Sequence, residues 1–258
     1  WKIPVQIPRI RLLVAKSAHL DGDRQNESLT LPQDIWPGTG TIRMTAASTA
    51  LVTLDGAVRF LYAYPYGCLE QRISLILPMV IAENMVKEFK LPIGQDFRKW
   101  TQNLLDELAP YQDRASGGFC YWPERQYHFR PSPYLSVQAF RLLHLARSRG
   151  YTVNTDIYNN LHRYLRNLLR LPDAQKQHYR FDTGYWQAVD IAVFGVLAET
   201  GSADRSYVHA LYDAALKQPV YVKAVLARAL YLLDKGEYKS KYRRLLREIR
   251  KAIKNESR

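Results

Sequence analysis

A cysteine and a glutamine three residues apart are the pair of side chains in this sequence best suited to covalent chemistry. Cys68 and Gln71 follow the turn-forming residues Pro65 and Gly67, at the start of an apolar, helix-like run. Side chains at positions i and i+3 of a helical turn point the same way. The Cys68 sulfur can therefore reach the Gln71 side-chain carbonyl, and loss of ammonia would join the two in an internal thioester. Because a thioester is an acyl donor, the pair predicts covalent capture of a nucleophile rather than turnover.

The predicted position of Cys68 at a helix N-terminus favours this chemistry. Unpaired backbone N–H groups and the helix dipole stabilise negative charge there. They favour the Cys68 thiolate as a leaving group and would stabilise the oxyanion formed when the Gln71 carbonyl is attacked. We expect Gly67 to allow a tight approach into the turn. Glu70 is expected to hydrogen-bond the loop and is not assigned as a base.

Two sequence segments resemble a known family. The run Pro65-Tyr66-Gly67-Cys68-Leu69-Glu70-Gln71 resembles the thioester motif P-Y-G-C-G-E-Q of the alpha-2-macroglobulin and complement family. Leu69 in place of the glycine resembles the bacterial branch. Further along, Gly117-Gly118-Phe119 and Pro133-Tyr134-Leu135-Ser136-Val137 resemble the family segment D-G-S-F … T-W-L-T-A, in the same chain order. The resemblance covers roughly residues 47–258 and implies that the chain is a fragment of a much larger protein.

Further site residues are predicted around the pair. A thioester must be kept from water, and we predict that Tyr64, Tyr121 and Trp122 shield it; for each aromatic side chain the alternative is ordinary core packing. Some complement-type members of the family carry a histidine that takes the acyl group and passes it to hydroxyl groups. His178 falls in that region by chain order, and the alternative is an exposed loop residue. If His178 does not act, lysine amines become the expected acceptors.

The resemblance implies a mainly α fold, an α/α toroid of helix hairpins, for residues 47–258, truncated at its C-terminal end. Apolar residues recur with helical spacing over much of this region, which by itself would also allow an α-solenoid. Pro78 is expected to kink or split the second of the predicted helices. The helical segments are Leu51–Tyr62, Leu69–Phe89, Phe97–Leu108, Tyr134–Arg147, Ile157–Leu169, Trp186–Glu199, Tyr207–Leu216, Val222–Leu233 and Tyr242–Ile253. Gly150, Gly201 and Gly236 are predicted to end helices in the left-handed conformation.

Residues 1–46 differ from the rest of the chain. Four prolines interrupt any long helix, and short β-prone runs lie between them. We predict part of a flanking, CUB-like β-sandwich domain followed by a linker. No initiator methionine or signal sequence precedes these residues, so a secretion signal is expected upstream.

The resemblance implies an endopeptidase inhibitor that acts as a covalent trap and is not an enzyme. A protease would cleave a bait region elsewhere in the parent protein, and a lysine of the protease would attack Gln71. The expected partners are target proteases and the flanking domains of the parent chain. The expected location is the periplasm or cell envelope, with a lipid anchor through an upstream segment as one option. Because the family shields the bond with other domains, we expect this fragment alone to hold a hydrolysed or unformed thioester.

Composition argues against several other kinds of function. The net charge of +13 would suit an anionic partner, but the basic residues are spread over helix faces and no nucleic-acid-binding motif accompanies them. The densest run, residues 239–254, has apolar residues at helical spacing and predicts an amphipathic helix with a solvated basic face. No apolar run is long enough to span a membrane. No cofactor or metal is expected, because His19, His128, His144, His162 and His209 have no metal-ligand spacing.

Three alternatives stay open at this point. A disulfide between Cys68 and Cys120 would exclude the thioester, since an acylated sulfur cannot also form a disulfide. An α/α-toroid enzyme would need an Asp-rich metal motif, a zinc set or paired carboxylates. This sequence has no D-D-x-x-D motif and no clustered histidines, and its acidic residues are scattered. A helical-repeat binding module would carry Cys68 and Gln71 incidentally. Replacing Cys68 by alanine distinguishes such a binding module from covalent capture. Loss of the covalent adduct would support the thioester, and unaltered capture of the partner would support plain binding.

Overall fold

The structure divides the chain into two compact units, Trp1–Val52 and Thr53–Arg258. The computed structural model describes residues 12–18, 22–33, 35–36, 38–42, 44, 46, 67–88, 96–123, 130–176 and 182–256. Within the first unit the described residues carry turns and irregular segments with no assigned strand. The predicted β-domain of residues 1–46 and its boundary therefore stay predictions. The helix predicted at residues 51–62 lies outside the described residues.

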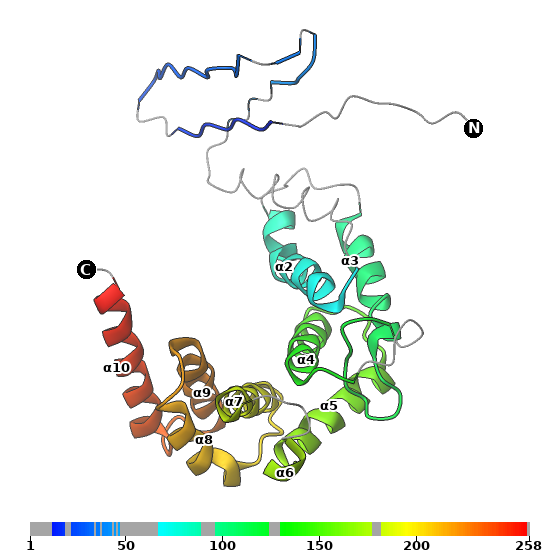
Figure 1. The fold of residues 1–258 in the computed structure, drawn as a ribbon, viewed down its shortest axis with the longest axis vertical. Coiled ribbons are helices and arrows are strands. Elements are labelled where there is room, and N and C mark those ends of the chain that lie inside the picture. Colours follow the sequence, from blue (N-terminus) through cyan, green and yellow to red (C-terminus); the bar gives the residue numbers. More distant parts are fainter. Residues whose placement is uncertain are drawn as a thin grey trace. The chain divides into compact units, whose positions relative to one another are not determined.

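The second unit is helical, which confirms the mainly α prediction (Figure 1). Its shorter elements are the 3-10 turns η1 (Ala109–Tyr111) and η3 (Arg205–Tyr207) and the four-residue helix α6 (Asp173–Lys176). Each of its longer helices coincides with a predicted segment to within a few residues at either end. They are α2 (Leu69–Glu88), α3 (Phe97–Asp106), α4 (Pro133–Ser148), α5 (Thr155–Leu169), α7 (Thr183–Glu199), α8 (Val208–Ala215), α9 (Val220–Leu233) and α10 (Lys239–Glu256).

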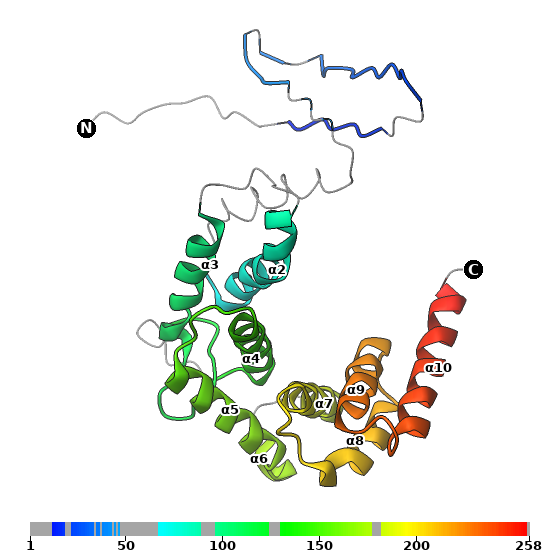
Figure 2. The ribbon, with the colours of Figure 1, turned by 180° about the vertical axis from the view of Figure 1, so that it is seen from behind.

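The helices of this unit alternate between two kinds of position (Figures 1 and 2). Helices α2, α4, α7 and α9 contact one another in succession, while α3, α5, α8 and α10 each pack against one or two of them. The burial of side chains follows the same division. Helix α5 buries one face, at Leu161, Tyr164, Leu165 and Leu168, as expected for an amphipathic surface helix. Helices α4 and α7 bury residues around most of their circumference, as expected for helices covered on several sides.

Helix α7 joins two hydrophobic cores. Val193 and Leu197 belong to a core shared with α2, α4 and α5. Ile191 and Phe194, on another side of the same helix, belong to a core shared with α8, α9 and α10. Because both sets are almost fully buried, the position of α7 couples the two halves of the unit.

The glycine predictions are confirmed at two positions and wrong at the third. Gly150 and Gly201 have φ of 75° and 68°, the left-handed conformation that ends a helix. Gly236 is not among the glycines with positive φ, because α9 ends earlier, at Leu233. There the Asp234 carboxylate accepts hydrogen bonds from the backbone N–H groups of Gly236 and Glu237, at 2.8 and 3.0 Å, and turns the chain without a left-handed glycine. Pro78 lies inside α2 and does not split it.

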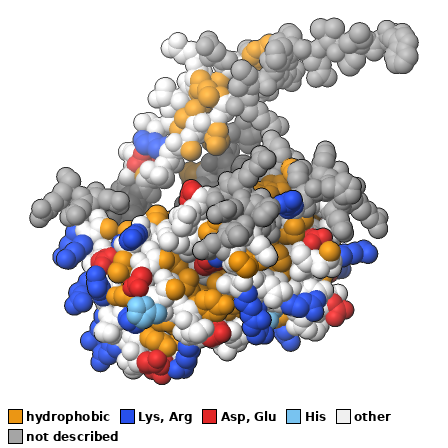
Figure 3. Space-filling view, turned by 60° about the horizontal axis from the view of Figure 1, so that its bottom comes forward, with side chains coloured by type: hydrophobic (Ala, Val, Ile, Leu, Met, Phe, Trp, Pro, Cys, Tyr) orange, Lys and Arg blue, Asp and Glu red, His pale blue; other side chains and the backbone are white. Residues whose placement is uncertain are grey.

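Basic residues are distributed as the sequence indicates. On the face shown in Figure 3, Lys and Arg side chains are scattered among acidic and hydrophobic ones. Helix α10 is amphipathic as predicted: Leu245 is fully buried against α9, while Arg243, Arg247 and Arg250 are exposed. None of the helices among the described residues is both long and apolar enough to cross a membrane.

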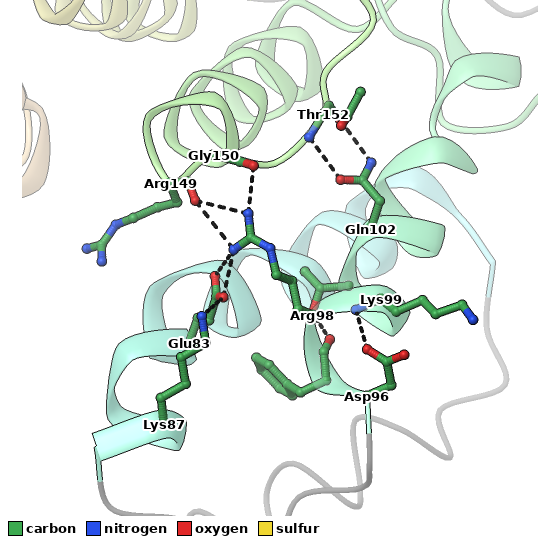
Figure 4. Close-up of polar contacts among 11 residues, drawn as sticks. Glu83, Lys87, Asp96, Arg98, Lys99, Gln102, Arg149, Gly150 and Thr152 are labelled. Atoms are coloured by element: carbon green, nitrogen blue, oxygen red, sulfur yellow. Dashed lines mark hydrogen bonds and ion pairs between the residues drawn. The ribbon is translucent and has the colours of Figure 1, made fainter.

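A buried carboxylate ties α2, α3 and the end of α4 together (Figure 4). Glu83 of α2 is 3% exposed and accepts hydrogen bonds from Arg98 at 2.7 and 2.9 Å and from Lys87 at 2.6 Å. Arg98 also donates to the carbonyl of Gly150 at 2.6 Å, and its guanidinium lies over the Tyr151 ring, 4.3 Å from the ring centroid. One arginine thus neutralises a buried charge and satisfies a carbonyl at the C-terminal end of α4.

We predict that the stabilising effect of Glu83 depends on pH. Burial alone would raise the pKa of Glu83, but the bonds from Lys87 and Arg98 outweigh it and hold the pKa below the ordinary 4.5. The ionised form therefore stabilises the fold above that value, and the effect is lost as pH falls through the lowered pKa. Glu83→Gln should cost about 1 kcal/mol at about pH 7, and the cost should be smaller at about pH 3, below the ordinary pKa of a glutamate.

Urea unfolding at both pH values checks this prediction. Glu88→Gln is the matched control, because Glu88 is exposed near the end of the same helix, and it should change the free energy of unfolding by less than about 0.5 kcal/mol. A difference between the wild-type chain and Glu83→Gln that stays constant with pH would contradict the assignment.

Candidate functional site

The two predicted reactive residues lie at the first turn of α2. The helix begins at Leu69, and the carbonyl of Cys68 accepts the first helical hydrogen bond, from the backbone N–H of Arg72 at 3.0 Å. Cys68 is therefore the N-cap residue and Gln71 the third residue of the helix. Residues at these two positions form the reciprocal capping box when they are Ser or Thr and Glu or Gln, each side chain reaching the backbone N–H of the other residue. Both residues are partly buried, and Glu70 between them is exposed.

Contacts from two later segments hold this turn. The backbone N–H of Leu69 donates to the carbonyl of Tyr121 at 2.9 Å, and the Leu69 side chain is fully buried. The Tyr111 hydroxyl donates to the carbonyl of Gly67. Arg72 pairs with Glu107 and lies over the Tyr111 ring, 5.7 Å from its centroid. The start of α2 is thus fixed by hydrogen bonds on both sides of Cys68.

The second motif forms a backbone bridge between α4 and α2. Phe119 is fully buried; its N–H donates to the Ser136 hydroxyl at 2.9 Å, and its carbonyl accepts from the N–H of Ser132 at 2.8 Å. Two residues later, the carbonyl of Tyr121 receives the N–H of Leu69. The two parts of the second motif, around Phe119 and around Ser136, are therefore hydrogen-bonded to each other, and the first continues to the turn that presents Cys68.

Glycines 117 and 118 are required by close packing. Gly117 has φ of 83°, and a Cβ there would lie 2.5 Å from the carbonyl oxygen of Asn160. A Cβ at Gly118 would lie 2.7 Å from both the Pro131 side chain and the Tyr164 ring. Gly67 differs, because its φ is not positive and an added Cβ would meet the nearest atom of a described residue, on the Arg72 side chain, only at 3.9 Å. The described residues therefore show no steric need for glycine at position 67.

Three tyrosines from different elements influence one another, and one of them, Tyr121, lies near Cys68. The pKa of Tyr121 is raised, first by burial and then by the nearby Glu70 and Tyr134, with a smaller contribution from Cys68. The pKa of Tyr185 is raised by burial first and then by Tyr121. Tyr121 precedes α4, Tyr134 is in its first turn, and Tyr185 is in the first turn of α7. Tyr185 was not singled out from the sequence, because only the packing of α7 against α4 brings it here.

The remaining predicted site residues divide into two groups. Tyr64, Pro65, Tyr66 and His178 lie outside the described residues, so their roles stay predictions. Tyr121 and Trp122 are described and are 42% and 38% exposed, so shielding by them also stays a prediction. Cys68 and Cys120 do not form a disulfide, and Cys120 is buried. No group of three or more His, Cys, Asp or Glu residues suited to a metal ion occurs in the part of the chain that the structure describes.

Comparisons of sequence and of structure with known proteins both find bacterial alpha-2-macroglobulins. Alpha-2-macroglobulin of Rickettsia conorii is 27% identical over 159 residues, which are 59% of this chain and 8% of that protein. An alpha-2-macroglobulin homolog of Yersinia pestis is 28% identical over 129 residues, 50% of this chain and 6% of that protein. Native E. coli alpha-2-macroglobulin has the same fold over 77% of this chain and 12% of its own, with a TM-score of 0.64 and 20% identity.

The chain is a homologue of part of the bacterial alpha-2-macroglobulins. The resemblance found in the sequence is thereby confirmed. Alpha-2-macroglobulin of Salmonella reacted with methylamine also shares the fold, with a TM-score of 0.61 and 22% identity over 76% of this chain and 13% of its own. The matched segments span less than a tenth of the two curated alpha-2-macroglobulins. No family model matches the chain.

We predict that Gly118→Ala destabilises the chain while Gly67→Ala does not. The added methyl group at position 118 must displace Pro131 or the Tyr164 ring, and such overpacking should cost about 2 kcal/mol. At position 67 the methyl group meets only ordinary van der Waals contacts from the part of the chain that the structure describes, so the cost should stay below about 0.5 kcal/mol. Urea unfolding of both variants measures the difference, and equal costs would contradict the packing argument.

Proposed function

We propose that this chain is the thioester-containing segment of a bacterial alpha-2-macroglobulin-like endopeptidase inhibitor. The observation that carries the proposal is the start of α2, where Cys68 is the N-cap and Gln71 the third helical residue. This placement suits condensation of a thiol with a carboxamide, and it lies in a chain homologous to bacterial alpha-2-macroglobulins. In this proposal the chain inhibits proteases by covalent capture and has no turnover of its own.

The proposed reaction has two steps. In the first, the Cys68 sulfur attacks the Gln71 side-chain carbonyl, a C–S bond forms and ammonia leaves. In the second, a deprotonated lysine amine of the protease attacks the same carbonyl, an amide bond forms, the C–S bond breaks, and the amine's proton passes to the Cys68 sulfur. The backbone N–H groups of Glu70 and Gln71, in the first turn of α2, are suited to stabilise the oxyanion of each tetrahedral intermediate, whereas that of Leu69 is already bonded to Tyr121.

The proposal extends to architecture and location. Residues 47–258 would form an α/α toroid, in which α2, α4, α7 and α9 are the inner helices and their partners the outer ones. Residues 1–46 would belong to a flanking β-domain. The parent protein would act in the periplasm or cell envelope, with its other domains as intramolecular partners. Tyr64, Tyr121 and Trp122 would shield the bond, and His178 would assist transfer to hydroxyl groups.

The relatives support the chemistry. The Salmonella protein of known structure has been reacted with methylamine, a small primary amine. The E. coli protein has been solved after activation by trypsin and by porcine elastase. For the present chain, we accordingly propose that primary amines react at Gln71 and that the physiological amine is a lysine of the target protease.

Mass spectrometry of residue 71 tests the proposal. A formed thioester lacks one ammonia, and its hydrolysis leaves a glutamate in place of Gln71. If residues 1–258 are prepared by themselves, any shielding that depends on other domains of a parent protein is removed, and we expect glutamate at position 71. Cys68→Ala should keep an unmodified glutamine there, since no thioester can form.

Gln102 in the same digest is the internal control for general deamidation, because its side chain is engaged with Thr152 and has no neighbouring cysteine in sequence. Unmodified Gln71 in the wild-type chain, together with no uptake of methylamine, would refute covalent capture by this chain. Covalent capture would also be refuted if Gln71 were converted to glutamate to the same extent in Cys68→Ala as in the wild-type chain.

A further inference from the structure

Helix α10 exposes apolar side chains that comparable helices of this unit do not. It is the last described helix and packs mainly against α9 (Figures 1 and 2). The large hydrophobic side chains of α3, α5 and α8 are all at least partly buried, whereas Leu246 and Ile253 of α10 are 41% and 55% exposed. The sequence predicts a solvated basic face for α10, so exposed aliphatic residues on this helix need a further explanation.

The exposed apolar and basic side chains of α10 lie on one face. Residues 243, 246, 250 and 253 are spaced by three or four positions, so their side chains form one row along the helix. Arginine alternates with a leucine or isoleucine in this row, and all four side chains are exposed. Two further exposed basic residues lie beside the row. We call these side chains the basic–apolar face: Arg243, Leu246, Arg247, Arg250, Ile253 and Lys254.

An aromatic side chain of α9 lies at the edge of this face. Tyr231 is 43% exposed, and its ring packs edge-on against Tyr242, one turn before Leu246, with 5.7 Å between the ring centroids. The Lys235 ammonium group lies over the Tyr231 ring, 4.8 Å from its centroid. The edge of the face thus also combines an apolar surface with a cation.

The described acidic side chains nearby are already paired with other cations. Glu248 of α10 pairs with Lys223 of α9 at 2.8 Å and with Arg244 at 3.6 Å. Glu237, between α9 and α10, pairs with Arg205 at 2.9 Å. In the part of the chain that the structure describes, none of the three arginines of the basic–apolar face forms an ion pair. The positive charge of the face is therefore available to an anionic partner.

We propose that the basic–apolar face of α10 binds the surface of an anionic lipid bilayer. A helix with lysine and arginine beside exposed aliphatic residues is suited to lie in the plane of the membrane interface, where its cations meet lipid phosphates and its apolar side chains enter the acyl boundary. Tyrosine is also favoured at that depth. A nucleic acid offers phosphates but no apolar layer for Leu246 and Ile253, so only the bilayer engages both components of the face.

The inference goes beyond the proposed function, because no residue of the basic–apolar face takes part in the chemistry of Cys68 and Gln71. Cosedimentation with vesicles measures the binding without regard to the thioester, so this test and the mass measurement at residue 71 can fail independently.

The first measurement compares anionic with neutral vesicles. Vesicles of phosphatidylcholine in which about one lipid in three is phosphatidylglycerol should bind the 258-residue chain about tenfold more tightly than phosphatidylcholine alone. Sodium chloride should weaken binding to the anionic vesicles, because salt screens interactions between exposed charges.

Matched arginine substitutions separate the basic–apolar face from the net charge of the chain. Each cation near an anionic bilayer contributes about fivefold in affinity, so Arg243→Gln combined with Arg250→Gln should weaken binding about 25-fold. Arg163→Gln combined with Arg166→Gln removes the same charge from exposed positions of α5 and should stay within about threefold of the wild type.

Ile253→Ser tests the apolar component, since it keeps every charge. It should weaken binding about fivefold, because an aliphatic side chain no longer enters the bilayer. The matched control is Ile81→Ser, at an isoleucine of α2 that is 51% exposed, and it should bind as the wild type does. All the substituted side chains are exposed, and circular dichroism establishes that each variant is folded.

Three results would overturn the proposal: binding to anionic vesicles no stronger than to neutral ones, equal losses in the two double arginine variants, or unchanged binding of Ile253→Ser. The last result, together with binding of duplex DNA that depends on Arg243 and Arg250, would assign the face to phosphate polymers rather than to a bilayer.

Discussion

The hydrogen bond from the backbone N–H of Leu69 to the carbonyl of Tyr121 is the contact on which the candidate site depends. A helix start leaves its first N–H groups without intrahelical partners, and here one of them is used to join two distant segments. Because Leu69 directly follows Cys68, this bond sets where the helix begins. If the helix began one residue later, Cys68 would no longer be the N-cap, and its relation to Gln71 would change.

The same bond explains why the motif around Phe119 accompanies the motif around Cys68. The segment passes between α4 and α5 only because Gly117 and Gly118 carry no side chains, and it reaches α2 with Tyr121 in position. Ser136 holds its middle through the N–H of Phe119. A change at any of these points would move the Tyr121 carbonyl and with it the start of α2. The geometry near Cys68 is thus a property of α4 as much as of α2.

Local signals in the sequence predict most of the fold. The helical spacing of apolar residues predicts where the long helices lie, because each of them buries at least one apolar face. Helix ends are less certain: α9 ends at an Asp234 turn rather than at Gly236, since a side-chain acceptor can replace a left-handed glycine. The four-residue α6 has no periodicity long enough to detect. Cys68 and Gln71 are found from their spacing, whereas Tyr185 is not, because its proximity to Tyr121 arises from packing between helices far apart in sequence.

The rigidity around Cys68 contrasts with the exposure of its surroundings. Leu69 and Phe119 are fully buried, so the turn is anchored in the main core, yet Tyr121 and Trp122 keep 42% and 38% of their surfaces exposed. A latent acyl donor needs both a fixed geometry, so that it can form, and a cover, so that water does not consume it first. In the proposed function the described part of this chain supplies the geometry. The cover would then come in part from other domains of the parent protein, so that control of the reaction could be separated from its chemistry.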